Sequence, residues 1–302
     1  MEFRHLKQMG DLGVVNPVQY SPRDEDSVRR ALQGVDVVIN LAGKDYETTG
    51  FLPWHKHFTF DDVHVKFPEM LTRLALEAGA TTMVHVSALA ADTSAISEWS
   101  QSKARGEEAV RAVAPGVTIV RPADIFGAED RFLNMFAWMH QTLPRVPLVD
   151  GGQALVQPVF VQDVAHAIAR IALSDKPEIA LGQTYDLAGP DVYSHREVVE
   201  FVFDAVRARF PFVVDIPPLV ADAIGYTFQG LPTPPITRDR FLRMQTDCVL
   251  DTSAATKRLA DVGVHATTLE QVGPHCLKAH QEQDHIFTKI SRDIYRERMY
   301  RQ

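Results

Sequence analysis

Several features that would point directly to a function are missing from this sequence. None of its 17 glycines lies in a GxGxxG or GxxGxxG segment, the turn whose backbone amides hold a dinucleotide pyrophosphate. The two cysteines, Cys248 and Cys276, have neither CxxC nor zinc spacing, which indicates a reducing compartment and no disulfide framework. No apolar run approaches the roughly 20 residues of a membrane-spanning helix, so we expect a protein that is soluble or peripheral to a membrane.

An excess of basic residues is also missing. The chain has 31 Lys and Arg residues against 39 Asp and Glu residues, which gives a formal net charge of -8. Proteins that bind a phosphate backbone rely on Lys and Arg in clear excess. A nucleic-acid partner is therefore not expected. The first residues match neither a secretory nor a mitochondrial targeting peptide, so they predict no cellular address.

The 302 residues are 45% hydrophobic, enough for a full α/β core with a smaller appended subdomain. Apolar, β-branched runs predict buried strands, and apolar residues at helical spacing predict helices between them. The strands are expected at 35–41, 83–86 and 117–120, and the helices at 24–32, 61–78 and 98–113. Pro68 should kink the second helix or split it in two. This alternation predicts an α/β, Rossmann-type, doubly wound parallel sheet.

The later part of the chain is less regular. We expect a strand at 156–161, a helix at 163–172, a strand at 185–187 and a helix at 194–209. The proline-rich residues 211–235 are expected to be irregular. The predicted units are a Rossmann-like domain over 1–182, a small irregular subdomain over 183–287 and a basic, solvated tail over 288–302.

Four segments resemble, in the correct order, motifs of the extended and atypical short-chain dehydrogenase/reductase family. These segments are Asn40-Leu41-Ala42-Gly43, Ser87, the RPADIFG run from Arg121 to Gly127, and the QPVFVQDVA run from Gln157 to Ala165. The resemblance covers roughly residues 20 to 200. It implies that the cofactor contacts are Leu41, Ala42, Gly43, Ser87, Lys103, Pro122, Ala123 and Ile125.

The catalytic pair of that family is incomplete in this chain. A working member carries a tyrosine four positions before a lysine on one helix face, and the lysine cation lowers the pKa of the phenol. Here the segment reads Trp99-Ser100-Gln101-Ser102-Lys103. An indole N–H does not titrate near neutral pH, and neither serine has the correct spacing. Ser87, Trp99 and Lys103 therefore predict a degenerate site with no catalytic residue, in which Ser87 and Lys103 hold nucleotide ribose or make structural hydrogen bonds.

The amino-terminal part of the family's fold is also incomplete. Residues 14–20 correspond to the family's third strand, so the first two strands and the glycine-rich loop have no counterpart. Removal of a central strand would expose the unpaired backbone groups of two neighbours. We therefore expect that the sequence is truncated at its amino end or that a further segment fills the gap.

Within this family the chain is most similar to the nucleotide-binding accessory subunits of mitochondrial respiratory complex I. The resemblance rests on residues 5–13, on residues 40–48, on the DIFGAEDRFLN run from Asp124 to Asn134, and on residues 236–239. It implies a structural, tightly bound NADPH, no turnover, and a place among the matrix-arm subunits near the membrane junction, on the matrix side of the mitochondrial inner membrane. Those subunits generally carry a tyrosine where Trp99 stands.

Two other readings stay open. The chain is alternatively an NADP-dependent extended reductase or epimerase with a rearranged acid, or a redox-sensing regulatory protein that exchanges nucleotide with the free pool. No metal site is expected. His55-Lys56-His57 has no neighbouring carboxylate, and histidines 275, 280 and 285 do not share a helix face.

Overall fold

The computed structural model describes residue 11 and residues 14–47, 58–228 and 236–281. A parallel sheet of four strands forms its centre, in the order β1 (Val37–Asn40), β2 (Thr82–Val86), β3 (Thr118–Pro122) and β8 (Thr184–Leu187). Every neighbouring pair in this sheet is parallel. The Rossmann-type α/β class is therefore confirmed.

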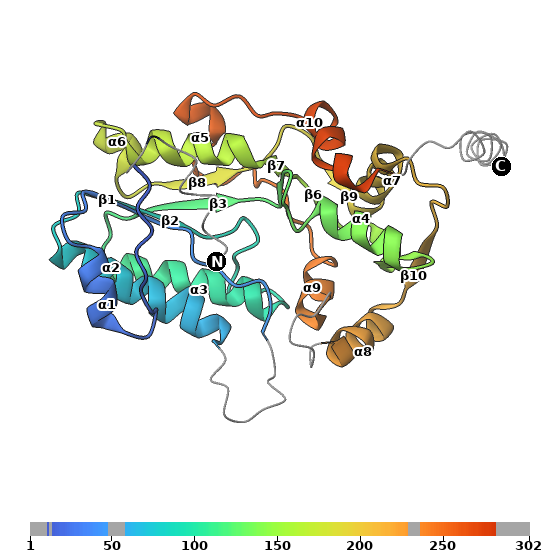
Figure 1. The fold of residues 1–302 in the computed structure, drawn as a ribbon, viewed down its shortest axis with the longest axis horizontal. Coiled ribbons are helices and arrows are strands. Elements are labelled where there is room, and N and C mark those ends of the chain that lie inside the picture. Colours follow the sequence, from blue (N-terminus) through green and yellow to red (C-terminus); the bar gives the residue numbers. More distant parts are fainter. Residues whose placement is uncertain (1–10, 12–13, 48–57, 229–235, 282–302) are drawn as a thin grey trace.

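Helices cover both faces of the sheet (Figure 1). One face carries α1 (Glu25–Ala31), α2 (Phe67–Glu77) and α3 (Glu98–Val113), and the other carries α5 (Val161–Ala172). On the first face Leu71 and Val110 pack with Met83 of β2, and on the second Ile168 packs with Val120 of β3. Burial on both faces explains why these strands read as unbroken apolar runs.

The helix expected at 61–78 is continuous but changes its winding directly before Pro68. Asp62–Lys66 forms a π-helical turn, η2, and the α-helix α2 begins at Phe67, with a helical backbone at the junction. Pro68, which has no backbone donor, lies in the first turn of α2. The π turn brings the carbonyl oxygen of His64 against α3. A Cβ atom added at Gly106 of α3 would lie only 2.0 Å from that oxygen, so the contact requires glycine.

The second half of the chain builds a separate apolar cluster beside the sheet. It contains α4 (Leu133–Thr142), β5 (Val146–Val149), α7 (His195–Val206), β10 (Val213–Ile216), α8 (Pro218–Phe228), α9 (Arg238–Arg243) and α10 (Leu269–Cys276). Strands β5 and β10 pair in parallel. Phe136, Leu148, Val202 and Phe241 are fully buried in this cluster, which holds α9 at the edge of the Rossmann sheet.

Short elements complete the described chain. They are β4 (Ile125–Phe126), β6 (Leu155–Val156), β7 (Val159–Phe160), β9 (Tyr193–Ser194), α6 (Pro177–Ala180), η3 (Asp150–Gly152), η4 (Leu259–Val262) and η5 (Lys278–His280). Strand β4 pairs in parallel with β7, and β6 pairs antiparallel with β9.

Three sequence-based expectations are wrong. Residues 14–20 form no strand, because no described strand pairs with them, Pro17 lacks a donor, and Val14 and Val18 are 72% and 56% exposed. In place of the single strand expected at 156–161 the structure has two short strands, β6 and β7, which Gln157 and Pro158 separate. The Gln157 side chain donates a hydrogen bond to the Gly189 carbonyl. The described part of 211–235 contains β10 and α8, because its prolines lie before the helix or in its first turn.

Some predictions lie outside the described residues. These are the motif at 5–10 and 12–13, the histidines at 55, 57 and 285, and the basic tail at 288–302. The domain boundary at residue 182 stays a prediction; Thr184–Leu187, just after it, forms the fourth strand of the sheet.

Replacement of Gly106 tests the contact between α3 and η2. Gly106→Ala should destabilise the fold by about 3 kcal/mol, because the new methyl group overlaps the His64 carbonyl and one of the two helices must shift. Gly116→Ala is the matched control, since an added Cβ there meets no atom within 4 Å. Urea unfolding measures both variants, and equal stabilities would contradict the packing described here.

Candidate functional site

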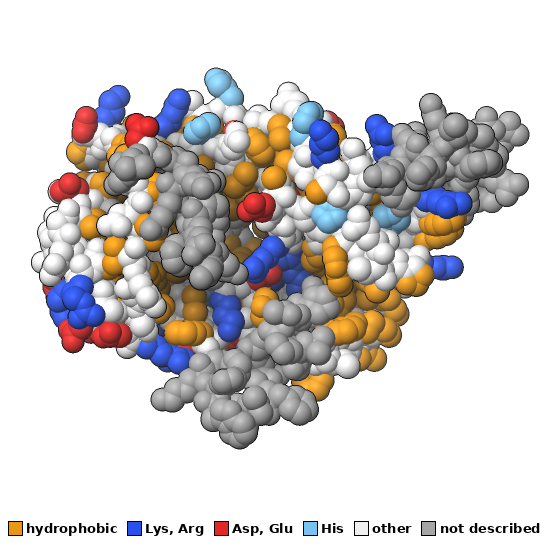
Figure 2. Space-filling view, viewed as in Figure 1, with side chains coloured by type: hydrophobic (Ala, Val, Ile, Leu, Met, Phe, Trp, Pro, Cys, Tyr) orange, Lys and Arg blue, Asp and Glu red, His pale blue; other side chains and the backbone are white. Residues whose placement is uncertain are grey.

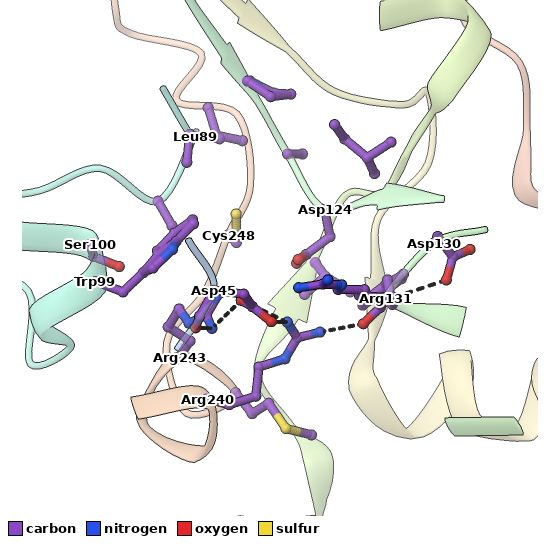
Figure 3. Close-up of a pocket in the computed structure, with 18 of the residues that line it drawn as sticks. Asp45, Leu89, Trp99, Ser100, Asp124, Asp130, Arg131, Arg240, Arg243 and Cys248 are labelled. Atoms are coloured by element: carbon purple, nitrogen blue, oxygen red, sulfur yellow. Dashed lines mark hydrogen bonds and ion pairs between the residues drawn. The ribbon is translucent and has the colours of Figure 1, made fainter. Parts of the chain in front are cut away.

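A cavity of about 810 Å³ opens where β2 and β3 end, between the sheet and the second apolar cluster (Figure 3). Four of the predicted cofactor residues line it: Ser87, Pro122, Ala123 and Ile125. The Ser87 hydroxyl is buried and has no hydrogen-bond partner in the described structure. An unpaired buried hydroxyl is unfavourable, so this group is suited to a ligand.

Of the other four predicted cofactor residues, Leu41, Ala42 and Gly43 lie in a turn that follows β1, and Lys103 lies on α3; none of the four lines the cavity. The Asn40 side chain accepts a hydrogen bond from the Ala42 amide at 3.0 Å and contacts Nδ1 of His85 at 3.0 Å. This side chain fixes the turn, leaving Leu41 68% exposed. Gly43 faces the Lys103 ammonium, since a Cβ at Gly43 would lie 3.5 Å from Nζ. The turn and Lys103 are therefore adjacent.

Lys103 is a buried cation on α3. Burial lowers its pKa to about 8, and the opposing charge of Glu107 only partly offsets this effect. Its ammonium donates no hydrogen bond to any residue that the structure describes. A buried charge without such bonds costs free energy, which makes Lys103 a second group suited to a ligand.

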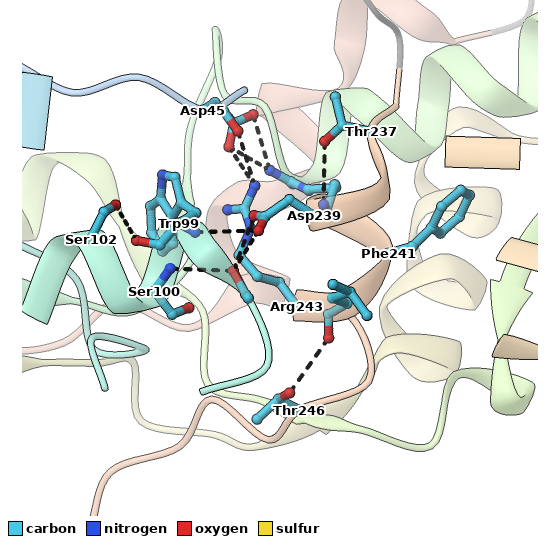
Figure 4. A network of polar contacts seen from close by, with 12 residues as sticks. Asp45, Trp99, Ser100, Ser102, Thr237, Asp239, Phe241, Arg243 and Thr246 are labelled. Atoms are coloured by element: carbon cyan, nitrogen blue, oxygen red, sulfur yellow. Dashed lines mark hydrogen bonds and ion pairs between the residues drawn. The ribbon is translucent and has the colours of Figure 1, made fainter. Parts of the chain in front are cut away.

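Trp99 lies in the wall of the cavity with its indole N–H already bonded. Nε1 donates to the Lys44 carbonyl at 2.8 Å, and the Arg243 guanidinium lies 4.3 Å from the ring centroid (Figure 4). Lys103 Nζ is 5.6 Å from the same centroid. The indole therefore packs between cationic side chains and offers no free donor to a ligand.

His64, behind Trp99, belongs to the same network. Its Nε2 accepts from the Lys44 amide at 3.0 Å, so Nδ1 carries the proton and donates to Ser102 Oγ at 2.8 Å. The Ser102 hydroxyl in turn donates to the Trp99 carbonyl. Burial, together with the charge of Lys103, lowers the pKa of His64 to about 3. His64 is therefore a neutral structural group at physiological pH.

The floor of the cavity is an ion cluster centred on Asp45 (Figure 3). Asp45 pairs with Arg243 at 2.8 Å and with Arg240 at 3.4 Å, and Arg240 also donates to the Arg131 carbonyl at 2.8 Å. Burial alone would raise the pKa of Asp45, but the two guanidinium groups outweigh it and hold the pKa below its ordinary value. Asp45 is therefore ionised and fixes α9 against the end of β1.

Asp239 attaches the same helix to α3. Its carboxylate accepts from the Ser97 hydroxyl at 3.0 Å and from the Trp99 amide at 3.2 Å, and it lies 3.4 Å from Arg243 (Figure 4). Negative charge at a helix N-terminus is stabilising. Helix α9 thus supplies a carboxylate to the start of α3 and two cations to Asp45.

Sequence reasoning missed His64, Asp45, Arg240 and Arg243. The i, i+4 spacing of Asp239 and Arg243 was the one local signal for α9. Nothing local indicates Asp45, because its partners lie 195 and 198 positions away.

The described residues contain no cluster of three His, Cys, Asp or Glu side chains that could hold a metal. They likewise include no helix long and apolar enough to cross a membrane. The free Ser87 hydroxyl and Lys103 ammonium fit ribose hydroxyls and a carboxamide, the polar groups at the nicotinamide end of a dinucleotide. A glycine-rich phosphate loop is missing from the sequence.

A family model and a solved structure define the class of protein to which the chain belongs. The family model of the RmlD substrate binding domain matches residues 23–221. The NAD complex of dTDP-glucose 4,6-dehydratase from Bacillus anthracis superposes with a TM-score of 0.56 at 16% identity, covering 71% of each chain. At that identity the likeness concerns the fold alone. The class of protein is therefore a short-chain dehydrogenase/reductase fold, and residues 23–221 belong to the family of the RmlD substrate binding domain.

Two relatives with higher sequence identity show the family within this class. The mouse protein named NADH dehydrogenase [ubiquinone] 1 alpha subcomplex subunit 9, mitochondrial, is 37% identical over 93% of this chain and 71% of its own length. The NADH-ubiquinone oxidoreductase 40 kDa subunit of Neurospora crassa is 32% identical over 92% of this chain and 70% of its own length. The chain belongs to this family of NADH dehydrogenase subunits.

The depressed pKa of Lys103 makes stability depend on pH in a defined direction. The pKa is about 8 in the folded chain and 10.5 in the unfolded chain, so between these values the unfolded state binds more protons and stability rises with pH. Lys103→Met removes the charge at similar length and should stabilise the nucleotide-free protein by about 2 kcal/mol at pH 7. The gain should shrink as the pH approaches 10. Urea unfolding at both pH values measures it, and a gain independent of pH would refute the assignment.

Proposed function

We propose that this chain is a non-catalytic accessory subunit of mitochondrial respiratory complex I that holds a nicotinamide nucleotide, NADPH by resemblance, in a structural role. One observation carries the proposal. The side chain at the position where a reductase needs its proton donor is Trp99, whose only polar hydrogen is bonded to the Lys44 carbonyl. Trp99 therefore replaces the tyrosine without replacing its chemistry.

The alternative, a reductase or epimerase with a rearranged acid, needs another group that exchanges protons in the cavity. Cys248 and His195 line it, but burial raises the pKa of the Cys248 thiol and lowers that of His195. At neutral pH the thiol keeps its proton and the imidazole lacks its second one. Burial thus shifts the pKa of both groups away from the range in which a general acid exchanges its proton.

The nucleotide contacts proposed for this role are Leu41, Ala42, Gly43, Ser87, Lys103, Pro122, Ala123 and Ile125. The Ser87 hydroxyl and the Lys103 ammonium are the two polar groups among them that lack a partner in the described chain. A bound nicotinamide riboside moiety would supply partners for both. It would therefore stabilise the folded chain by mass action as well as occupy the cavity.

An exposed apolar surface supports docking on other subunits. This α8 surface comprises Phe210, Phe212, Leu219, Val220, Tyr226 and Phe228, of which Leu219 and Tyr226 are 83% and 76% exposed. Figure 2 shows the hydrophobic side chains gathered over α8 and β10, at the lower right. Contiguous exposed apolar surfaces are typical of interaction sites. We place the chain in the matrix arm near the membrane junction, on the matrix side of the mitochondrial inner membrane, with the α8 surface against its neighbours.

Nucleotide release and turnover test the structural role together. The denatured chain should release NADP(H) in equimolar amount, and the native chain should oxidise no NADPH when sugar-nucleotide or steroid substrates are added. Released nucleotide is quantified by chromatography and turnover by absorbance at 340 nm. Substrate-dependent turnover that Ser87→Ala abolishes would establish the reductase instead, and rapid exchange with free nucleotide would favour a redox-sensing role.

A charge placed on the α8 surface tests the docking role. Leu219→Glu should reduce co-purification with complex I, because an interface would have to bury the new carboxylate. Its effect on stability should stay within about 0.5 kcal/mol, since the side chain is exposed. Leu173→Glu is the matched control, as Leu173 is also exposed, at 77%, but follows α5. Equal co-purification of both variants with complex I would remove the α8 surface from the proposal.

A further inference from the structure

Five consecutive residues, 41–45, belong to two sites at once. Leu41, Ala42 and Gly43 form the turn proposed to contact the nucleotide, and Gly43 faces Lys103. Lys44 and Asp45 follow directly; the Lys44 carbonyl binds Trp99 of α3, and the Asp45 carboxylate binds Arg243 of α9. Only Lys44 separates the turn from Asp45, and each residue spans at most about 3.6 Å of chain, so the position of the turn limits where Asp45 can lie.

Lys44 binds Trp99, and Asp45 binds α9. The Lys44 carbonyl accepts the indole hydrogen of Trp99, and the Asp45 carboxylate pairs with both Arg240 and Arg243. The side chains of Arg240 and Arg243 are only 13% and 14% exposed. Loss of the carboxylate would leave two nearly buried cations with fewer partners, which is strongly unfavourable.

Helix α9 is in turn fixed to α8. A Cβ atom at Gly225 of α8 would lie 2.5 Å from the Cα and amide nitrogen of Arg238, so the two backbones touch. Arg238 and Asp222 also form an ion pair at 3.2 Å. The two helices lie side by side in Figure 1 and are expected to move as one unit.

We propose that nucleotide binding is coupled to the position of the α8–α9 unit through Lys44 and Asp45. The nucleotide fixes the turn at 41–43, the turn places Asp45, and Asp45 holds α9 and with it the exposed α8 surface. The inference rests on the proposed nucleotide site. Because coupling between two sites is reciprocal in free energy, a partner that holds α8 in place also raises the affinity for the nucleotide.

Hydrogen exchange of the full chain, measured by mass spectrometry, tests the coupling. Removal of NADPH should speed amide exchange in 218–228 and 238–244 on the order of tenfold, a typical size for coupled sites. Asp45→Asn should produce the same rise with NADPH present, and removal of NADPH should then add nothing further. The variant should also release NADPH on the order of tenfold faster, followed by the fluorescence of the bound nucleotide.

Asp215→Asn is the matched control. It breaks another ion pair, Asp215 to Arg196 at 2.6 Å, which is more exposed than the Asp45 cluster and joins β10 to α7, away from the turn. Exchange in α9 and NADPH release should stay at wild-type values in this variant. Arg240→Gln is a milder second variant that leaves the Arg243 pair intact, and it serves if Asp45→Asn does not fold. Its exchange rate in α9 and its rate of NADPH release should lie between those of the wild type and those expected for Asp45→Asn.

Each possible result decides the question. Unchanged exchange in α9 after removal of NADPH, or unchanged NADPH release in Asp45→Asn and Arg240→Gln, would overturn the coupling and leave the nucleotide-holding role standing. A preparation that neither releases nor binds NADPH would overturn the proposed function and the coupling together. Chromatographic measurement of the nucleotide content separates these two cases.

Discussion

The ion cluster around one carboxylate, Asp45, joins the end of the Rossmann sheet to α9. Asp45 lies just after β1 and pairs with Arg240 and Arg243, which come from the far end of the sequence. All three side chains are largely removed from water, so the attraction between them is poorly screened, and the loss of any one would leave uncompensated buried charge. The position of α9, the support of Trp99 and the floor of the cavity all depend on this contact.

Outside this ion cluster, two neutral histidines, His64 and His85, lie near the buried ammonium of Lys103. His64 and His85 both have pKa values lowered to about 3, first by burial and then by the charge of Lys103. Their hydrogen bonds to Ser102 and Asn40 satisfy them in the neutral form. They therefore fix the geometry of the turn and of α3 without taking part in proton exchange.

The sequence predicted the parts of the fold that local physical rules decide. The β-branched run at 35–41 contains β1, and the helix expected at 98–113 matches α3, whose first turn is capped by Ser97. Residues 14–20 have the composition of a strand but pair with none of the strands that the structure describes. Gln157 and Pro158 interrupt a strand through a side-chain hydrogen bond that no periodicity reveals. Ser87 and Trp99 were predicted as site residues, whereas Asp45 was not, because its role depends on a helix about two hundred positions away.

The unpaired groups of the site indicate what the fold is adapted to hold. A purely structural lysine would be expected to bond a carbonyl or carboxylate, yet Lys103 donates no hydrogen bond to the described chain. The Ser87 hydroxyl, in the wall of the cavity, also lacks a partner in the described structure. Each group is destabilising by itself, and packing does not require either, since an apolar side chain of similar size would fill the same space. A ligand that bonds both would offset the two penalties at once, and for this reason the site is suited to a ligand with several polar groups.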